Sequence, residues 1–477
     1  NFLIKSYHAK INATKLGLGL TALINVSLVK QIGNTVENFT KKIINLDEII
    51  ECFQLTGSFD YQLKVNDSLG NFYTYGGFGN TGGGTVYHNV LWKWNGSGWA
   101  WLNGDTLASA SSRYGTKGVA AASNNPGPRY SATSFVDDDN NLWLFGGFIS
   151  SVGRLNDLWK WDGTNWTWMK GDSIPGKFPV YGTTGIAAST NNPGGTIDAK
   201  ANLLSNGDVI VFGGFGYYDS GSKKGTGSLT ELWKWDGVNW TLLENLKGSE
   251  YGNYGSIGVS AITNHPGARS NQAQWLDCDD NLWVFGGEGF DFGSGSGLLS
   301  DLWKYDGTNW TFVHGDSVIN VHPVSKSTKG TPHIENNPGA RSEGISFVDN
   351  DGSFWVVSGK NDNSRSSSAR TNDGWKWSDT AWTHMYGSAN SNGMRASVNS
   401  SNAQHSTIGG RILGTGGYAK KTATLFVFGG SGIERNWGDQ NRLWEITPGE
   451  YPTPRIKVYG NGIRITNGQT TTSTNDS

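Results

Sequence analysis

Asn141-Leu-Trp-Leu-Phe-Gly-Gly147, followed by Leu155-Asn-Asp-Leu-Trp-Lys-Trp161, is the stretch that decides the fold of this 477-residue chain. Aromatic and β-branched runs bounded by Gly, Asn and Asp are typical of β-strands, so each half predicts one strand. The pattern occurs six times, and the residue that ends its first half is Gly77, Gly147, Gly214, Gly287, Gly359 and Gly430. The steps between these glycines are 67 to 73 residues long, which indicates a repeat protein.

Each repeat predicts an antiparallel meander, because a further hairpin signal follows the two strands. Asp162-Gly163, Asp236-Gly237 and Asp306-Gly307 stand where a tight turn would join the third strand to the fourth. Meanders repeated at a fixed spacing favour four-stranded blades around a channel. The chain is therefore predicted to be mainly β.

The repeats resemble the kelch repeat of galactose-oxidase-type central domains over residues 67–448. The shared features are a glycine pair that ends one strand, an aromatic residue in the next strand and a Trp one strand later. The resemblance implies a kelch-type β-propeller with six recognisable four-stranded blades. The first and last repeats are incomplete, so a ring of six blades and a ring of seven both stay open. The period is about 20 residues longer than the usual kelch period of about 50.

Residues that recur in every repeat are expected to be scaffold, and residues that do not recur are candidates for a binding site. The connections after the second and fourth strands of a meander lie on one common face, and they are long in this chain. Exposed aromatic side chains there suit stacking on sugars or the centre of a protein interface. The candidate ligand-binding residues on these long loops are Tyr217, Tyr218, Phe290, Phe292, Arg365, Arg370, Arg435 and Trp437.

Residues 1–66 have a different composition, with none of the 22 tryptophans and no arginine. Apolar runs predict strands over 20–30, 49–54 and 61–65, and helical spacing predicts a helix over 34–44. Lys15-Leu-Gly-Leu-Gly-Leu-Thr-Ala22 and Glu51-Cys-Phe-Gln-Leu-Thr-Gly-Ser-Phe-Asp-Tyr61 resemble the effector-binding half of the Lrp/AsnC transcription regulators.

This second resemblance implies a small truncated α+β segment of the ferredoxin-like kind. It places Gly57 and Asp60 in the loop with which that family binds amino acids. Ser58 replaces the common acidic residue, and the closing helix and strand are missing, so a remnant without ligand is the favoured interpretation. A fragment of an amino-acid-responsive transcription regulator is the alternative. Without a helix-turn-helix upstream, no contact with nucleic acid is expected from this chain.

The two compositions meet near Asn66, which predicts three regions: 1–66, the repeats at 67–452, and 453–477. Pro454-Arg-Ile-Lys-Val-Tyr-Gly-Asn-Gly-Ile-Arg-Ile-Thr-Asn-Gly468 resembles the start of a choice-of-anchor surface β-sandwich module, and a polar tail follows it. That resemblance implies an extracellular or cell-surface location in a bacterium. Because the junction cuts through two incomplete domains rather than a linker, we expect the chain to be a gene-fragment or assembly product.

Charge and cysteine content exclude several classes of protein. The 38 Lys and Arg residues and 40 Asp and Glu residues leave a formal charge of −2, which gives no attraction to nucleic acid or anionic membranes. The stretch 16–29 contains Thr21, Asn25 and Ser27 and is too short and polar to span a bilayer. Two cysteines cannot make a disulfide framework.

No cofactor is predicted. The copper centre of kelch-type oxidases needs two histidines, a tyrosine and a Cys–Tyr crosslink, and the scattered histidines and the position of Cys278 do not fit it. The acidic turns with Asp137, Asp139, Asp349 and Asp351 offer oxygen ligands for Ca²⁺. They lack EF-hand spacing, and Asp is a common turn former, so solvated turns are the favoured interpretation.

The favoured function is a non-catalytic, secreted or cell-surface propeller that binds a glycan or a protein through its long-loop face. A carbohydrate-active enzyme of the galactose-oxidase kind is the alternative. The identity of the ligand and the oligomeric state do not follow from the sequence.

Overall fold

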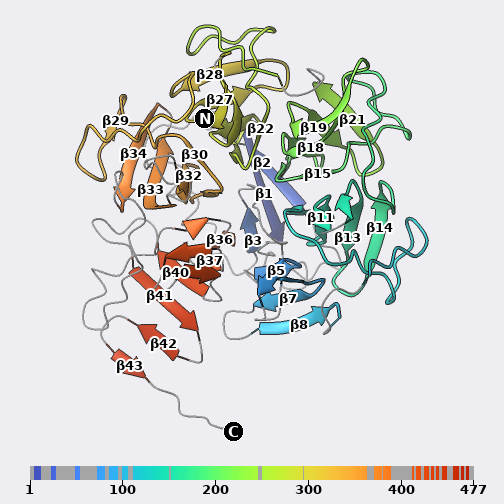
Figure 1. Cartoon of the computed structure of the whole chain (residues 1–477). Coiled ribbons are helices and arrows are strands. Elements are labelled where there is room, and N and C mark those ends of the chain that lie inside the picture. The colour runs from blue at the N-terminus through green and yellow to red at the C-terminus, as the bar shows by residue number, and fades with distance from the viewer. Residues whose placement is uncertain are drawn as a thin grey trace. The chain divides into compact units, whose positions relative to one another are not determined.

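The computed structural model divides the chain into two compact units, Asn1–Thr56 and Gly57–Ser477 (Figure 1). The structure describes residues 5–11, 23–27, 49–53, 72–80, 85–94, 99–105, 111–149, 152–244, 250–293, 295–361, 370–378, 380–387, 411–412, 415–419, 424–428, 431–433, 437–439, 443–447, 455–460, 463–466 and 469–471. All regular elements within these ranges are β-strands. In this part of the chain no helix is long and apolar enough to cross a membrane.

The first unit contains a three-stranded antiparallel sheet in the order β2-β1-β3. Its strands are β1 (Lys5–Ile11), β2 (Leu23–Ser27) and β3 (Ile49–Phe53). β2 and β3 fall within the apolar runs that predict strands. The helix expected over 34–44, the strand expected over 61–65 and the loop with Gly57 and Asp60 lie outside the described residues.

The second unit repeats one antiparallel meander, and we call its successive copies sheets 1 to 6. Sheets 1 and 2 contain β4 (Phe72–Tyr75), β7 (Leu91–Trp94) and β8 (Trp99–Asn103), and then β9 (Thr133–Val136), β10 (Leu142–Phe145), β13 (Leu158–Trp161) and β14 (Trp166–Lys170). Sheets 3 and 4 contain β16 (Lys200–Leu203), β17 (Val209–Phe212), β20 (Leu232–Trp235) and β21 (Trp240–Glu244), and then β23 (Ala273–Leu276), β24 (Leu282–Phe285), β27 (Leu302–Tyr305) and β28 (Trp310–His314).

Sheets 5 and 6 carry additional strands. Sheet 5 contains β31 (Ile345–Val348), β32 (Phe354–Asn361), β33 (Arg370–Ser378) and β34 (Ala381–Tyr386), with β29 (Pro332–His333) beside β34 and β30 (Arg341–Ser342) beside β32. Sheet 6 contains β36 (Thr415–Ala419), β37 (Thr424–Phe428), β40 (Leu443–Thr447), β41 (Arg455–Gly460), β42 (Ile463–Thr466) and β43 (Gln469–Thr471).

β41 corrects one sequence-based expectation. The sequence indicates that the last repeat is incomplete, but β41 pairs antiparallel with β40 and gives sheet 6 a fourth strand. This strand comes from the segment assigned to a C-terminal module. An unpaired edge of β40 would leave backbone N–H and C=O groups without partners, and the apolar alternation of residues 456–459 suits a strand that covers it.

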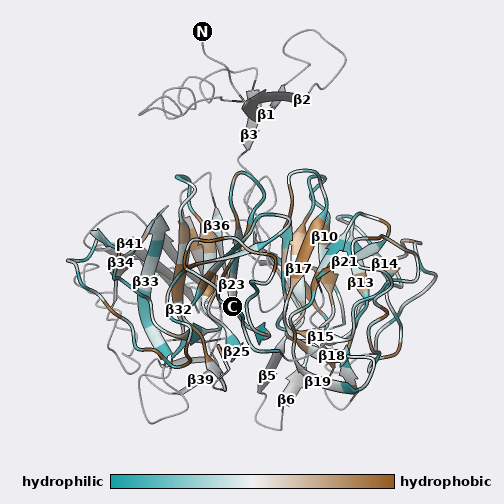
Figure 2. Ribbon diagram, turned by 90° about the horizontal axis from the view of Figure 1, so that it is seen from above, coloured by the Kyte–Doolittle hydropathy of each residue, from teal (hydrophilic) through white to brown (hydrophobic). Residues whose placement is uncertain are grey.

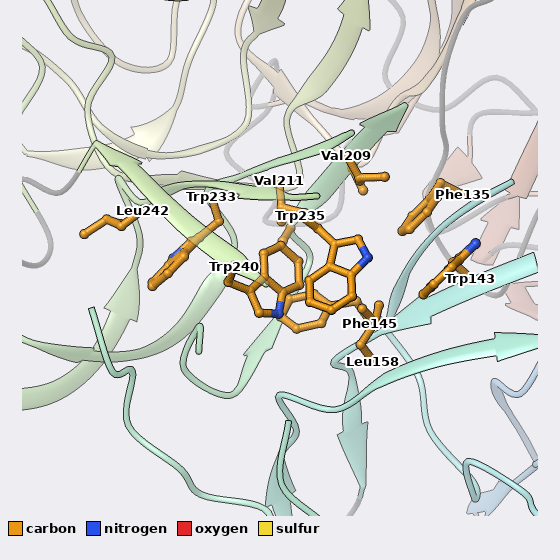
Figure 3. Packing of buried hydrophobic residues seen from close by; sticks show 12 residues of the cluster. Phe135, Trp143, Phe145, Leu158, Val209, Val211, Trp233, Trp235, Trp240 and Leu242 are labelled. Atoms are coloured by element: carbon orange, nitrogen blue, oxygen red, sulfur yellow. The ribbon is translucent and has the colours of Figure 1, made fainter. Parts of the chain in front are cut away.

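The apolar cores lie between neighbouring sheets rather than within one sheet. Figure 3 shows the cluster shared by sheets 2 and 3, where Phe145 of β10 meets Trp240 of β21 with ring centroids 5.2 Å apart. Similar clusters join sheets 1 and 2, sheets 3 and 4, and sheets 4 and 5. Trp159 and Trp303, equivalent residues of the third strands, are completely buried. Recurrence therefore identified buried scaffold at these two positions.

The glycine pairs of sheets 1 to 4 form backbone hydrogen bonds to the next sheet, and we call these contacts glycine locks. The N–H of Gly214 donates to the carbonyl of Arg269 at the entrance to sheet 4, at 2.9 Å. A Cβ on Gly213 (φ +66°) would lie 2.6 Å from that same carbonyl oxygen. Only glycine tolerates both the left-handed backbone and this approach. Equivalent bonds run from Gly77 to Arg129, from Gly147 to Thr196 and from Gly287 to Arg341.

The segments that follow the glycine pairs are antiparallel ribbons. They are β5–β6 (Phe78–Asn80, Thr85–Tyr87), β11–β12 (Phe148–Ile149, Gly153–Arg154), β18–β19 (Phe215–Asp219, Lys224–Ser228), β25–β26 (Glu288–Phe290, Ser296–Leu298) and β38–β39 (Ser431–Ile433, Trp437–Asp439). The connections expected as long loops therefore contain paired strands at these five places. Short strands β15 (Thr196–Ile197), β22 (Arg269–Ser270) and β35 (Arg411–Ile412) extend three of the ribbons to three strands.

The ribbons define one end of the meander sheets, which we call the ribbon end. Figure 2 shows β15, β18, β19 and β25 along the same edge of the second unit. The turns between third and fourth strands, such as Asp162–Asn165, lie at the opposite end of their sheets because the strands are antiparallel. The linkers that enter each sheet also reach the ribbon end, since Tyr130 pairs with Phe148.

Candidate functional site

Buried ion pairs recur at equivalent positions of sheets 2, 4 and 5. Arg129 donates two hydrogen bonds to Asp157, at 2.7 and 2.8 Å, and both side chains are fully buried. Arg269 with Asp301 and Arg341 with Asp373 repeat the arrangement. Each aspartate also accepts a hydrogen bond from the indole N–H two residues later. These charges recur and are completely paired, which identifies them as scaffold.

Sheet 3 departs from this arrangement. Thr196 stands where the other linkers have arginine, and Glu231 stands where the other third strands have aspartate. The carboxylate of Glu231 accepts hydrogen bonds from Tyr181 and from Trp233. Burial without a cation raises the pKa of Glu231 to about 7, although the hydrogen bonds from Tyr181 and Trp233 oppose that shift.

A row of half-buried aromatic rings crosses the ribbon end from sheet 1 to sheet 3. Tyr87 of β6 stacks on Tyr130 at 5.8 Å, and Tyr130 meets Phe148 of β11 edge to face at 5.4 Å. Phe178 of the next linker contacts Tyr217 of β18 at 5.3 Å. We call these residues, together with Phe215 and Arg154, the aromatic row.

Arg154 joins the two halves of the row. Its guanidinium carbon lies 4.7 Å from the ring centre of Phe215, 5.7 Å from that of Tyr217 and 5.8 Å from that of Phe148. It forms no ion pair with any residue in the described ranges, and its buried Nε has no hydrogen-bond partner there. A guanidinium held by rings and free of carboxylates keeps donors available for a ligand.

Backbone contacts fix the row in place. The N–H of Gly176 donates to the carbonyl of Arg154 at 2.9 Å, and the N–H of Tyr217 donates to the carbonyl of Gly195 at 3.0 Å. A Cβ on Gly195 would lie 2.6 Å from the carbonyl oxygen of Arg154 and 3.1 Å from the ring of Tyr217. Glycine at this position therefore lets the linker approach both side chains of the site.

The side chains of the aromatic row have a composition that suits ligand binding. Half-buried rings provide flat apolar faces that stack on sugar rings or on apolar side chains. The guanidinium of Arg154 adds a fork of donors that suits hydroxyl or carboxylate oxygens. Lys224 on β19 lies over the ring of Phe178 at 5.2 Å, and it pairs with Asp219 at 2.9 Å.

Of the predicted site residues, the structure brings Tyr217 into the aromatic row. Tyr218, its neighbour on β18, is half-buried and pairs across the ribbon with Gly225. Phe290 and Phe292 lie in the ribbon region of sheet 4, where Phe290 meets Tyr251 at 5.5 Å and Phe292 is 62% exposed. They therefore share the ribbon end with Tyr217 but contact different residues.

The structure corrects the predicted position of Arg370. It was expected on an exposed loop, but it begins β33 and is buried, because β32 and β33 extend past the position where a loop was predicted. Arg365, Arg435, Gly57 and Asp60 lie outside the described residues. Trp437 begins β39, and only its backbone is described.

The acidic turns hold their carboxylates in turn hydrogen bonds. Asp137 accepts from the backbone N–H groups of Asp139 and Asn141 and from the indole of Trp143 at 2.7 Å. Asp349 likewise accepts hydrogen bonds from the backbone N–H groups of Asp351 and Ser353 and from the indole of Trp355. Within the described residues, no group of three or more His, Cys, Asp or Glu side chains could hold a metal ion. Cys278 is exposed in the equivalent turn of sheet 4.

Sequence reasoning missed Arg154, Phe148, Phe178 and Tyr130. A signal for Arg154 was available, because it precedes Asp157 by the same three residues that separate Arg370 from Asp373. Arg154 could therefore have been selected with Arg370. Phe178 and Tyr130 come from linkers far from Tyr217 in the sequence, and only the packed structure brings them to the ribbons.

Residues 21–67 match the Lrp/AsnC ligand binding domain family. The Bkd operon transcriptional regulator of Pseudomonas aeruginosa is 34% identical over 62 residues, and the transcriptional regulator AzlB of Bacillus subtilis is 35% identical over 63 residues. Each match covers 13% of this chain and 40% of the relative. The chain thus spans less than half of the length of these curated relatives.

Two solved structures resemble most of the chain at low similarity. The structure of YjhT has 14% identity and a TM-score of 0.47, and the match covers 85% of this chain and 98% of that one. A fungal alcohol oxidase of the AA5 family, in complex with copper, has 12% identity and a TM-score of 0.37, with 87% and 76% covered. Similarity at this level does not identify a function.

Proposed function

We propose that residues 67–452 form a non-catalytic kelch-type propeller that binds a glycan or a protein through the ribbon end. The regular period and the glycine locks between sheets support the propeller. The first strands of sheets 2 to 6 also contact one another in series, because β9 contacts β16, β16 contacts β23, β23 contacts β31 and β31 contacts β36. First strands that line one common side are what blades around an axis require.

The observation that carries the binding function is the aromatic row with Arg154 at its centre. Rings from three successive sheets converge there with a guanidinium that has no carboxylate partner among the described residues. The scaffold cation Arg129 of sheet 2, by contrast, is paired with Asp157. An unpaired cation among aromatic rings is the composition of a recognition site.

The test is a glycan and protein array probed with the labelled full chain. Tyr217→Ala and Arg154→Gln are each expected to raise the Kd of the best ligand about tenfold or more, since each removes a contact worth about 1.4 kcal/mol. Trp101→Ala is the matched control, because Trp101 is a 51% exposed aromatic on β8 outside the row. Unchanged affinity in both site variants contradicts the proposal.

A second candidate function belongs to residues 21–67, and the family match to this segment favours it. We propose that this segment binds an amino acid through the loop with Gly57 and Asp60. Calorimetry with leucine should then show binding in the wild type and none in Asp60→Ala.

An extracellular or cell-surface location is proposed for the repeats, and secretion of the protein into the medium or surface labelling of cells would test it.

A further inference from the structure

Glu231 is a buried acid without the counter-ion that its equivalents have. In sheets 2, 4 and 5 the aspartate at this position pairs with an arginine from the linker. In sheet 3 the position of that arginine is occupied by Thr196, whose side chain carries no charge. Glu231 is nevertheless 3% exposed. A lone carboxylate in such a position is costly, so its protonation is favoured.

Two hydrogen-bond donors face the carboxyl group of Glu231. Tyr181 O–H donates to Oε1 at 2.5 Å, and Trp233 Nε1–H donates to Oε2 at 2.8 Å. Tyr181 also stacks on Trp233, with ring centroids 6.0 Å apart. Charged groups on the neighbouring elements include Lys200 on β16, the Asp219–Lys224 pair on the ribbon, Glu244 on β21, which pairs across from Leu232, and Arg269, which pairs with Asp301.

Tyr181 connects Glu231 to the ribbon. The backbone N–H of Asp219 donates to the hydroxyl oxygen of Tyr181 at 3.2 Å. Asp219 is the last residue of β18, two residues after Tyr217. The phenol therefore donates to the buried carboxylate with its proton and accepts from the ribbon with its oxygen.

We propose that Glu231 is a proton-binding site that adjusts the β18–β19 ribbon through Tyr181. When Glu231 is ionised, it accepts the proton of the Tyr181 hydroxyl. When Glu231 is protonated, its own O–H donates to the oxygen of Tyr181, and that oxygen is also the acceptor for Asp219. Protonation thus reverses one hydrogen bond and changes the anchor of the ribbon.

The titration falls near neutral pH. Burial raises the pKa of Glu231 to about 7, against about 4.3 for an exposed glutamate. The folded state then holds the proton more tightly than the unfolded state. The stabilisation is present below the ordinary pKa and is lost as the pH rises through the folded pKa, over the window from about 4.3 to about 7.

The effect of this proton on ligand binding rests on the proposed function, because Tyr217 belongs to the aromatic row. The proton site itself does not depend on any ligand. An experiment on the free chain can therefore fail without contradicting the binding function, and ligand binding can fail without contradicting the proton site.

Hydrogen–deuterium exchange of the full chain at pH 5.5 and pH 8.5, corrected for intrinsic rates, tests the proposal. In the wild type, peptides that cover residues 215–228 should change their protection by about threefold or more between the two pH values. Glu231→Gln cannot ionise and should show no such change. The double variant Thr196→Arg/Glu231→Asp, which restores the pair of the other sheets, should show none either.

Glu244→Gln is the matched control. Burial also raises the pKa of Glu244 to about 7, and its hydrogen bond from Trp310, at 2.5 Å, opposes that shift. Glu244 ends β21, and its carboxylate accepts a hydrogen bond from Trp310 rather than from Tyr181. This variant should keep the wild-type response of residues 215–228. A ribbon that responds equally in Glu231→Gln and the wild type, or does not respond in the wild type, overturns the proposal.

Discussion

At the residue scale, Trp303 shows that recurrence in the sequence reports burial. Trp303 is fully buried between sheets 3 and 4, next to Tyr254 and Phe312. Trp303→Ala, like Trp159→Ala, is expected to lower the free energy of unfolding by about 3–5 kcal/mol because it leaves a cavity. Trp101→Ala should cost less than about 1 kcal/mol, since that side chain is half exposed. Denaturant titration measures the free energy of unfolding of each variant. Equal losses in Trp303→Ala and Trp101→Ala would show that recurrence in the sequence does not separate scaffold residues from surface residues.

Asp373 gives a pH prediction at the same scale. Burial alone would raise the pKa of Asp373, but Arg341 and the hydrogen bonds from Arg341, Trp375 and Thr371 outweigh burial and hold that pKa below its ordinary value. The stabilisation is therefore present above the unfolded pKa of about 3.9 and is lost as the pH falls through the folded pKa. Asp373→Asn should unfold at a lower temperature than the wild type at pH 7, and the difference should narrow toward pH 3. A difference that stays constant would contradict this account.

At the element scale, the glycine locks explain how the repeats are joined. Gly213→Ala is expected to destabilise the protein by about 2 kcal/mol more than Gly237→Ala. Both residues have positive φ, at +66° and +92°, but only the Cβ at 213 would meet a neighbouring backbone oxygen. Because both variants strain the backbone, the difference between their stability losses reports the contact between sheets at Gly213. Thermal unfolding measures the difference, and identical midpoints would show that the locks are dispensable.

The elements also show what sequence can predict. The strands and the buried tryptophans followed from apolar periodicity and turn residues, because those signals are local. The sequence predicts loops where the ribbons lie, because their Gly- and Ser-rich strands, such as 224–228, lack the apolar alternation of a core strand. The pairing of Arg129 with Asp157 could not be predicted, because charged residues are normally exposed and only the packed linker brings the two together.

At the scale of the whole molecule, the central claim is that ligands bind at the ribbon end of the second unit. The repeated scaffold residues are paired and packed, whereas the aromatic row spans three sheets and retains an unpaired guanidinium among the described residues. Within the described residues, the row combines aromatic surface from several sheets with the guanidinium donors of Arg154.

The most direct test is a hydrogen-exchange footprint of the full chain with and without the best ligand from the array. The account predicts new protection in peptides that cover 148–154, 175–178 and 215–226, at the ribbon end. It predicts no change in the turns at 162–165, 236–239 and 306–309, at the opposite end. Protection confined to those turns, with the ribbons unchanged, would contradict the central claim.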